Sequence, residues 1–264
     1  MAHEIPAVLP PLPRDRSAIA RGYAPSMALE WLAAGWRDFR TQPGPSVAYG
    51  LGVFVVSLIV VVGFVRFGLD YILFPAFAGF MVIGPVLAVG LYEKSRRLAA
   101  GEPATLADMV FVKAASQGQI LFTGVLLCGL MLLWMRAAVI IYALFFGLLP
   151  FPGLNHIAPM LFTTPTGWAL LIVGTAIGAL FAAFSFAISV LAIPMLLERR
   201  IDCLTAMGTS MQLVWNNLPA LLTWGAIVLV LFVLSLATGL LGLIVVFPLL
   251  GHGTWHVYRA IHPV

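Results

Sequence analysis

Long uninterrupted runs of apolar residues dominate the sequence. A helix that crosses a hydrocarbon core of about 30 Å needs roughly 20 consecutive apolar residues. Four runs that satisfy this requirement predict membrane-spanning helices at 46–67, 71–92, 118–148 and 166–197. A last run, 218–258, is about twice the required length, and we divide it near Thr238 and Gly239. The pattern therefore predicts six membrane spans.

Shorter segments between these runs have a helical periodicity of their own. Apolar residues recur at three- and four-residue steps before the first, third and fifth spans: Leu29, Leu32, Trp36 and Phe39; Leu106, Met109 and Val110; Leu204, Met207, Met211 and Val214. Polar residues occupy the other faces, and Thr105 is positioned to cap the second segment. The periodicity predicts three short amphipathic helices that lie at the inner membrane surface.

Similar residues recur at corresponding places along the chain. Trp36 is followed closely by Pro43 before the first span, as Trp215 is followed by Pro219 before the fifth. The exits of the second and fourth spans also correspond: Pro85 then Glu93, and Pro194 then Glu198, each followed by paired arginines. We interpret the chain as three units, each an amphipathic helix followed by a helical hairpin. Internal repeats occur in transporters, but duplication also occurs in proteins that transport nothing, so the repeat is evidence of architecture only.

The positions of the basic residues predict the orientation in the membrane. Twelve of the 14 lysines and arginines fall on one predicted side: Arg14, Arg16, Arg21, Arg37, Arg40, Lys94, Arg96, Arg97, Lys113, Arg199, Arg200 and Arg259. Basic loops remain on the cytoplasmic side of a bacterial inner membrane, so we expect both termini there. Residues 1–25 are predicted to be a disordered, Pro-rich cytoplasmic tail, and residues 26–264 a single transmembrane domain.

Composition restricts the class of protein further. Hydrophobic residues make up 62% of the 264-residue chain and charged residues only 9%. A soluble domain is about one quarter charged, so a water-soluble enzyme, a disordered protein and a nucleic-acid binder are all excluded. Cys128 and Cys203 form no Cys-x-x-Cys pair and indicate no disulfide framework. The fold class is an all-α, polytopic membrane helix bundle in a lipid bilayer, with an undetermined oligomeric state.

Arg136 lies within an apolar run, and a basic residue at membrane depth is a candidate functional residue. Alternatively, a third span that begins near Gly118 reaches the outer interface near Arg136. The side chain then extends to lipid headgroups or pairs with Asp70 in the outer turn, and residues 137–151 continue as an apolar extension along the surface.

His252 and His256 are four residues apart, so they share a helix face and are candidate ligands of a metal ion or a haem iron. No cysteine, aspartate or glutamate lies nearby as the third protein ligand that zinc normally has. The alternative is that His252 is a buried donor and the neighbouring aromatic residues belong to the interfacial belt. The sequence contains no catalytic motif, and we predict no catalytic residue, no metal and no bound cofactor.

Two charged clusters lie at the predicted inner ends of the second and fourth spans. Glu93 is followed by Arg96 and Arg97, and Glu198 by Arg199, Arg200 and Asp202. They are candidates for binding an anionic lipid or a protein partner. The alternative is that they determine topology and form a few salt bridges.

Four segments together resemble a known family: Ala34–Phe39, Gly84–Glu93, Ile193–Leu197 and Phe247–Arg259. They are similar to the bacterial integral membrane proteins classified as domain of unknown function 2189, and the resemblance extends from about residue 26 to residue 260. The family implies no established activity.

Some relatives are labelled as a cytochrome oxidase catalytic subunit, which resembles a twelve-helix bundle with six histidine ligands. This chain has five histidines, of which only His252 and His256 lie in a predicted span. The resemblance is compatible with a respiratory neighbour or assembly helper, and not with an oxidase core.

Our leading hypothesis is a non-enzymatic scaffold, accessory subunit or assembly factor of the bacterial inner membrane, with a membrane protein as its partner. The alternative is a small-molecule or lipid transporter whose path lies near Arg136 and His252. A haem or metal protein that uses His252 and His256 is a third hypothesis.

Overall fold

The regular elements of this protein are helices throughout the part of the chain that the computed structural model describes, residues 22–147 and 153–261. Five of them are long and apolar enough to cross a membrane: Pro43–Arg66, Asp70–Ala99, Gln117–Phe146, Pro165–Glu198 and Leu218–Ala237. The predicted all-helical class and the first five predicted spans are therefore confirmed as apolar helices of membrane-spanning length. The chain is an integral membrane protein with several apolar helices.

The sixth predicted span corresponds to α13 (Leu243–Ile261), which is not among those five. Its second half carries His252, His256 and Arg259, which lower its apolar character. Eleven of its 19 residues are nevertheless buried inside the protein, including both His252 and Trp255. A helix enclosed by other helices can keep polar side chains that a lipid-facing helix cannot. Because α13 is not among the five apolar helices, the six-span topology stays a prediction.

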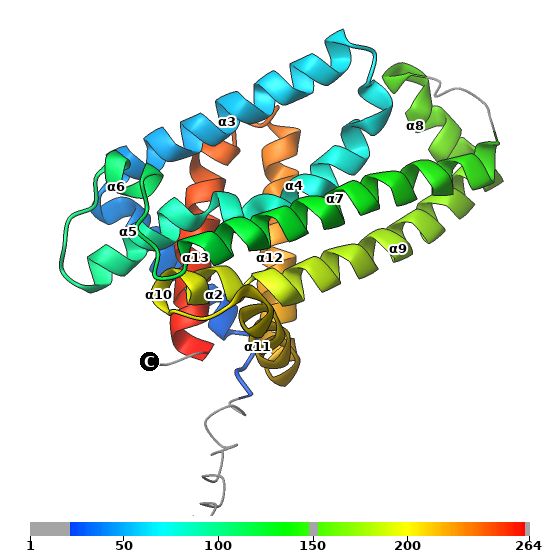
Figure 1. The fold of residues 1–264 in the computed structure, drawn as a ribbon. Helices are drawn as coiled ribbons and strands as arrows, with labels where there is room; N and C mark the ends of the chain where they lie inside the picture. Colours follow the sequence, from blue (N-terminus) through cyan, green and yellow to red (C-terminus); the bar gives the residue numbers. More distant parts are fainter. Residues whose placement is uncertain (1–21, 148–152, 262–264) are drawn as a thin grey trace, which may run out of the picture.

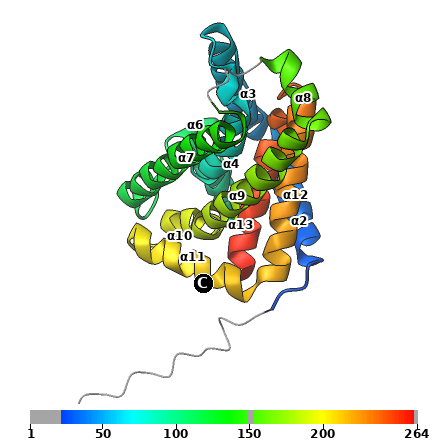
Figure 2. The same ribbon diagram turned by 90° about the vertical axis from the view of Figure 1, so that its right-hand side faces the viewer.

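The longer helices form two groups, which Figures 1 and 2 show from perpendicular directions. The first group, side by side, is α2 (Met27–Thr41), α12 (Leu218–Ala237) and α13. The second group is α4 (Leu73–Leu87), α7 (Gln117–Phe146) and α9 (Pro165–Ser189). Helix α3 (Pro43–Arg66) packs on α13, and α8 (Leu154–Thr163) packs on α9 in the predicted outer connection.

The second and fourth spans each break near one end. After the 3-10 turn η1 (Asp70–Ile72), the second consists of α4 and α5 (Val89–Ala99); the fourth consists of α9 and α10 (Ala192–Glu198). Pro194 lies in the first turn of α10, where its missing N–H costs no helical hydrogen bond. The backbone N–H of Leu191, at this break, donates instead to the Ser210 hydroxyl at 3.2 Å. The break therefore leaves this buried donor satisfied.

Helices are present at the three segments predicted to be amphipathic, while their location at the inner membrane surface stays a prediction. They are α2, α6 (Leu106–Val110) and α11 (Cys203–Asn216). Thr105 caps α6 as predicted, because its hydroxyl accepts from the Asp108 N–H at 3.3 Å and its own N–H donates to the Asp108 carboxylate at 3.0 Å. Trp36 and Trp215, near the ends of α2 and α11, are both exposed. Exposed tryptophans at helix ends are typical of a membrane interface.

Helix α7 differs from its prediction. It is one continuous helix of 30 residues, and Arg136 is its twentieth residue. The predicted surface extension over 137–151 is therefore wrong, because its residues as far as Phe146 continue the same helix. Thirty residues span about 45 Å, which exceeds a hydrocarbon core of about 30 Å, so such a helix crosses a bilayer with a tilt.

Glycines allow α13 to lie unusually close to its neighbours. A Cβ atom built on Gly35 of α2 would lie 2.5 Å from the backbone nitrogen of Gly253 and 2.8 Å from the Leu249 carbonyl oxygen. One built on Gly50 of α3 would overlap the carbonyl of Ile244. Backbone atoms cannot move aside as a flexible side chain can, so both positions require glycine. The close contacts place α13 against α2 and α3 at once.

We expect Gly35→Ala to lower the free energy of unfolding by about 1–3 kcal/mol, because the added methyl group forces α2 away from α13. Thermal unfolding of the purified protein in detergent measures the effect. Gly52→Ala is the matched control, since a Cβ there would meet no atom within 4 Å. It should leave stability unchanged or slightly raised. Equal stability of the two variants would contradict the close contact.

Candidate functional site

Seven polar residues at the junction of α2, α3, α5 and α13 form one hydrogen-bonded group. We call it the polar cluster: Asp38, Gln42, Ser46, Lys94, Ser95, His252 and His256. Three of the four helices come from the first 99 residues, and the fourth is the last helix described. The cluster therefore joins the two ends of the sequence.

Lys94 lies at the centre of this junction and is completely buried, with 0% of its surface exposed. Its ammonium group donates to the backbone carbonyl of Gln42 at 2.5 Å and to the Ser46 hydroxyl at 2.7 Å. Gln42 is the C-cap of α2. A cation is favourable there, because the last carbonyl groups of a helix carry partial negative charge. Lys94 thus stabilises the bend between α2 and α3.

His252 is also completely buried, and both of its ring nitrogens are hydrogen-bonded. Nε2 lies 2.9 Å from the Ser46 hydroxyl, and Nδ1 lies 2.8 Å from the Ser95 hydroxyl. Lysine can only donate, so Ser46 accepts from Lys94 and is free to donate its own proton to Nε2. The matching tautomer carries its proton on Nδ1 and donates it to Ser95.

Asp38 lies at the end of this chain of hydrogen bonds that is opposite Lys94. Its Oδ2 lies 2.8 Å from His256 Nε2. Burial raises the pKa of Asp38, but hydrogen bonds from His256 and Ser95 outweigh it, so the pKa lies below the ordinary value of 3.8. Asp38 is therefore a carboxylate at neutral pH. The polar cluster connects a buried ammonium to this carboxylate through hydroxyl and imidazole groups, each with a matched donor and acceptor.

Glu93 and Glu198, two of the predicted site residues, are each occupied by partners within the protein. Glu93 is 2% exposed and accepts from Arg96 at 2.8 and 2.9 Å and from Arg97 at 3.0 Å. Arg97 also reaches Asp108 at 2.9 Å, which connects α5 to α6. Glu93 therefore pairs within α5, and it is the Arg97–Asp108 pair that joins α5 to α6.

Glu198 connects the end of α10 to the end of α13. Its Oε2 accepts from the Tyr258 hydroxyl at 2.7 Å, and its Oε1 from Arg259 at 3.0 Å. Asp202, from the same predicted cluster, caps α11 by accepting from the Thr205 N–H at 2.9 Å. Its pKa is lowered from the ordinary value of 3.8, chiefly by the hydrogen bonds from Thr205.

His252 and His256 do fall in one group, but with different partners. His252 uses both ring nitrogens on serines, while His256 faces Asp38. Within residues 22–147 and 153–261, no three His, Cys, Asp or Glu side chains lie close enough together to hold a metal ion. The geometry gives these two histidines a role in joining helices, and a shared metal would require both to exchange partners.

Arg136 and Asp70 lie apart from the polar cluster. Arg136 is exposed on α7, and Asp70 is half-buried in η1. No ion pair joins the two within the described part of the chain. The sequence suggested two structural roles for Arg136: its side chain extends to lipid headgroups, or it pairs with Asp70. The exposure of Arg136 fits the first role.

A cavity of about 1090 Å³ lies between the two groups of helices. We call it the lateral cavity; α4, α7, α9, α12 and α13 provide most of its wall. The described residues that line it are apolar and aromatic, with a few hydroxyl groups, and none of them is charged. Neither Arg136 nor His252 lines it. A volume of this size is at the upper end of the range for ligand pockets, about 300–1,000 Å³.

Five members of the polar cluster were not predicted from the sequence: Asp38, Gln42, Ser46, Lys94 and Ser95. Lys94 lies next to the paired arginines, so its charge was assigned to the cytoplasmic surface. The sequence signal for Ser46 was weak, because Ser46 is the first residue of a predicted span, where a small polar residue is common. The cluster is revealed by contacts between residues far apart in the sequence, such as Lys94 with Ser46, 48 positions apart, and Ser95 with His252, 157 positions apart.

The comparisons with known proteins agree with a membrane protein. Residues 73–198 match the model of a family described as predicted integral membrane protein, domain of unknown function 2189. The resemblance inferred from sequence motifs is therefore confirmed over this segment, which covers α4 to α10. No curated protein and no solved structure matches the chain.

We expect His252→Leu to lower the free energy of unfolding by about 2–5 kcal/mol, because two buried hydroxyl groups each lose a hydrogen-bond partner. His256→Leu, which removes a half-buried contact, should cost only about 1 kcal/mol. Chemical or thermal unfolding of both variants in detergent gives the comparison. An equal or larger loss for His256→Leu would contradict the central position of His252.

Absorbance and metal analysis of the same preparations test the ligand hypothesis, which requires bound metal that either substitution removes.

Proposed function

Taking this family of membrane proteins as the premise, we propose that the chain is a non-enzymatic scaffold, accessory subunit or assembly factor of the bacterial inner membrane. One observation carries the proposal: the ionisable side chains of the polar cluster are bonded to other groups of the protein. Lys94 and Asp38, the two charged members, are used to join helices. Groups committed to packing are poor candidates for acid–base chemistry, which needs a side chain within reach of a substrate.

The proposal includes a six-span topology with both termini in the cytoplasm, and an origin from three repeated units. The order of the helices supports it, since α2 precedes α3 and the α4–α5 segment, α6 precedes α7 and α9, and α11 precedes α12 and α13. The alternative of transport along a path near Arg136 and His252 lacks such support. His252 has 0% exposure and two hydrogen-bonded ring nitrogens, and the hydrogen-bonded chain ends at Lys94, which is fully buried. A conducting path would need an opening at that end.

Affinity purification of the full chain from native membranes in a mild detergent tests the accessory role. We expect a membrane-protein partner in a fixed stoichiometric ratio, and repeated recovery of the bare chain would contradict the proposal.

Arg136→Ala is the control for the transport alternative. Because Arg136 is exposed, membrane abundance and partner recovery should remain within about twofold of wild type. Loss of a measurable flux at unchanged abundance would favour transport instead.

Cysteine labelling tests the topology. In a Cys128→Ala, Cys203→Ala background, a membrane-impermeant maleimide should label Phe67→Cys in spheroplasts, because Phe67 is 82% exposed at the predicted outer end of α3. Glu102→Cys, exposed on the predicted inner side, should react only after permeabilisation. The reverse pattern would overturn the proposed orientation, and labelling of both sites in spheroplasts would overturn the second span.

A further inference from the structure

The lateral cavity is bounded by helices of membrane-spanning character. Four of the five helices that provide most of its wall, α4, α7, α9 and α12, belong to the five candidate spans. The cavity therefore lies at the depth of the hydrocarbon core. Membrane amphiphiles are the molecules that are concentrated at that depth, so they are the natural occupants of an apolar cavity there.

The cavity is long in one direction. Its wall follows α9 from Leu170 to Ser189, and a helical stretch of this length extends over about 28 Å. Small residues on α9 create the space: a Cβ atom built on Gly174 would meet no atom within 4 Å. An extended hydrocarbon chain has the length and the apolar character that this wall requires.

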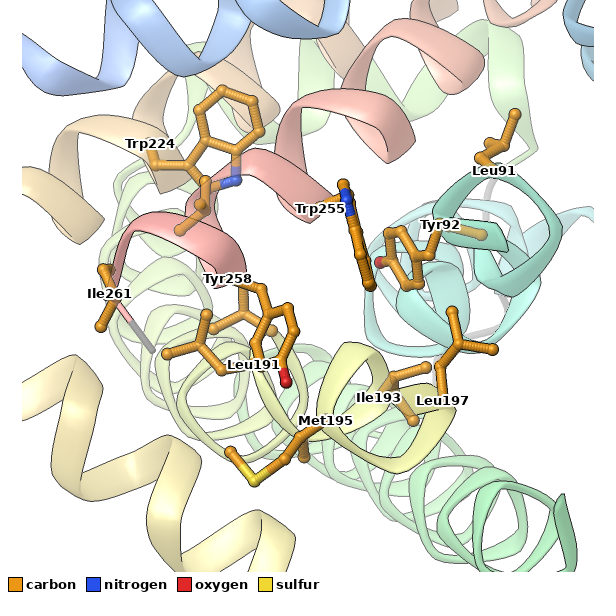
Figure 3. Close-up of a cluster of buried hydrophobic side chains, with 14 of the residues drawn as sticks. Leu91, Tyr92, Leu191, Ile193, Met195, Leu197, Trp224, Trp255, Tyr258 and Ile261 are labelled. Carbon is orange, nitrogen blue, oxygen red and sulfur yellow. The ribbon is translucent and has the colours of Figure 1, made fainter. Parts of the chain in front are cut away.

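One hydroxyl without a hydrogen-bond partner among the described residues lies at the α5/α10 end of the cavity. Tyr92 is 1% exposed and lines the cavity, and no hydrogen bond to its hydroxyl is found within the described residues. Trp224 also lines the cavity, but its Nε1 is buried and its ring packs against Trp31 of α2 and Gly253 of α13, so this nitrogen is not offered to a ligand. Figure 3 shows both side chains in one buried cluster, although they come from α5 and α12. A tyrosine hydroxyl without a partner inside the protein can donate a hydrogen bond to a ligand in the cavity.

The remaining hydroxyls at this end cannot replace this donor. Thr254 donates to the Leu250 carbonyl at 2.8 Å, and Ser189 to the Ser185 carbonyl at 2.6 Å, so each keeps only acceptor capacity for a ligand. None of the lining residues within 22–147 and 153–261 is charged. A charged headgroup would be buried here without a counter-ion, at a high cost in desolvation.

We propose that the lateral cavity binds one long-chain amphiphile whose uncharged head accepts hydrogen bonds. The chain lies along α9, and the head lies at the α5/α10 end, where the Tyr92 hydroxyl donates to it. This site goes beyond the proposed accessory role and does not depend on it.

A brominated long-chain monoacylglycerol is the probe, because it is uncharged, accepts hydrogen bonds and quenches tryptophan fluorescence. Binding to the purified full chain is measured by native mass spectrometry and by quenching. We expect one bound molecule per chain. Tyr92→Phe should weaken binding about threefold to tenfold, since one hydrogen bond is lost. Tyr71→Phe, at the opposite end of the same cavity, should leave binding unchanged.

Filling the cavity provides the second part of the test. Gly174→Phe should weaken binding at least about tenfold, which corresponds to 1.4 kcal/mol. Gly129→Phe is the matched control, because Gly129 is an exposed helical glycine with equally open surroundings outside the cavity. Gly174→Leu repeats the test with a smaller side chain if the phenylalanine variant unfolds. Equal binding by the Gly174 and Gly129 variants would overturn the site.

The head group is tested with two further probes that carry the same chain. The corresponding fatty acid, charged at neutral pH, and the corresponding alkane, which has no head, should each bind at least about tenfold more weakly than the monoacylglycerol. Equal binding of the fatty acid would overturn the uncharged head. Equal binding of the alkane, or an equal loss in Tyr71→Phe and Tyr92→Phe, would overturn the assignment of the head to the α5/α10 end.

Discussion

The burial of Lys94 is the constraint on which the rest of the structure depends. An ammonium group removed from water is very unfavourable unless nearby acceptors replace its hydration. Here those acceptors are the C-terminal carbonyl of α2 and the Ser46 hydroxyl of α3. Ser46 can satisfy both Lys94 and His252 only if α13 lies beside α3. One buried charge thus determines how four helices meet, and a shift of any one of them would leave a polar group unpaired.

Helix α13 has the composition that this position requires. Its first half is apolar, and its second half carries the histidines that complete the polar cluster. Close contact at Gly253 allows α2 to approach, while Trp224 of α12 packs over the same glycine. The aromatic and aliphatic side chains in Figure 3 then enclose the end of α13 between α5, α10 and α12. The lateral cavity lies beyond this packed region, where the two groups of helices separate.

Much of this fold could be predicted from local patterns, because membrane helices and amphipathic helices have strong periodic signals. The helix break near Gly239 and the cap at Thr105 are local features of that kind. The continuity of α7 was missed because Arg136 was taken as the end of a span, although a tilted helix can carry it to the interface. The partner of His256 is Asp38, 218 positions away, and no pattern within one helix indicates such a contact. Lys94 was misjudged for a related reason, since its burial depends on two helices that are distant in sequence.

A double-mutant cycle on Ser46 and Ser95 tests the central claim most directly. Both serines bond to His252 from different helices, so the claim that they act through one hydrogen-bonded chain requires their effects to be coupled. Unfolding of Ser46→Ala, Ser95→Ala and the double variant should give an interaction energy of about 0.5–3 kcal/mol. Strictly additive losses would contradict the account, because they would mean that the two contacts stabilise their helices independently.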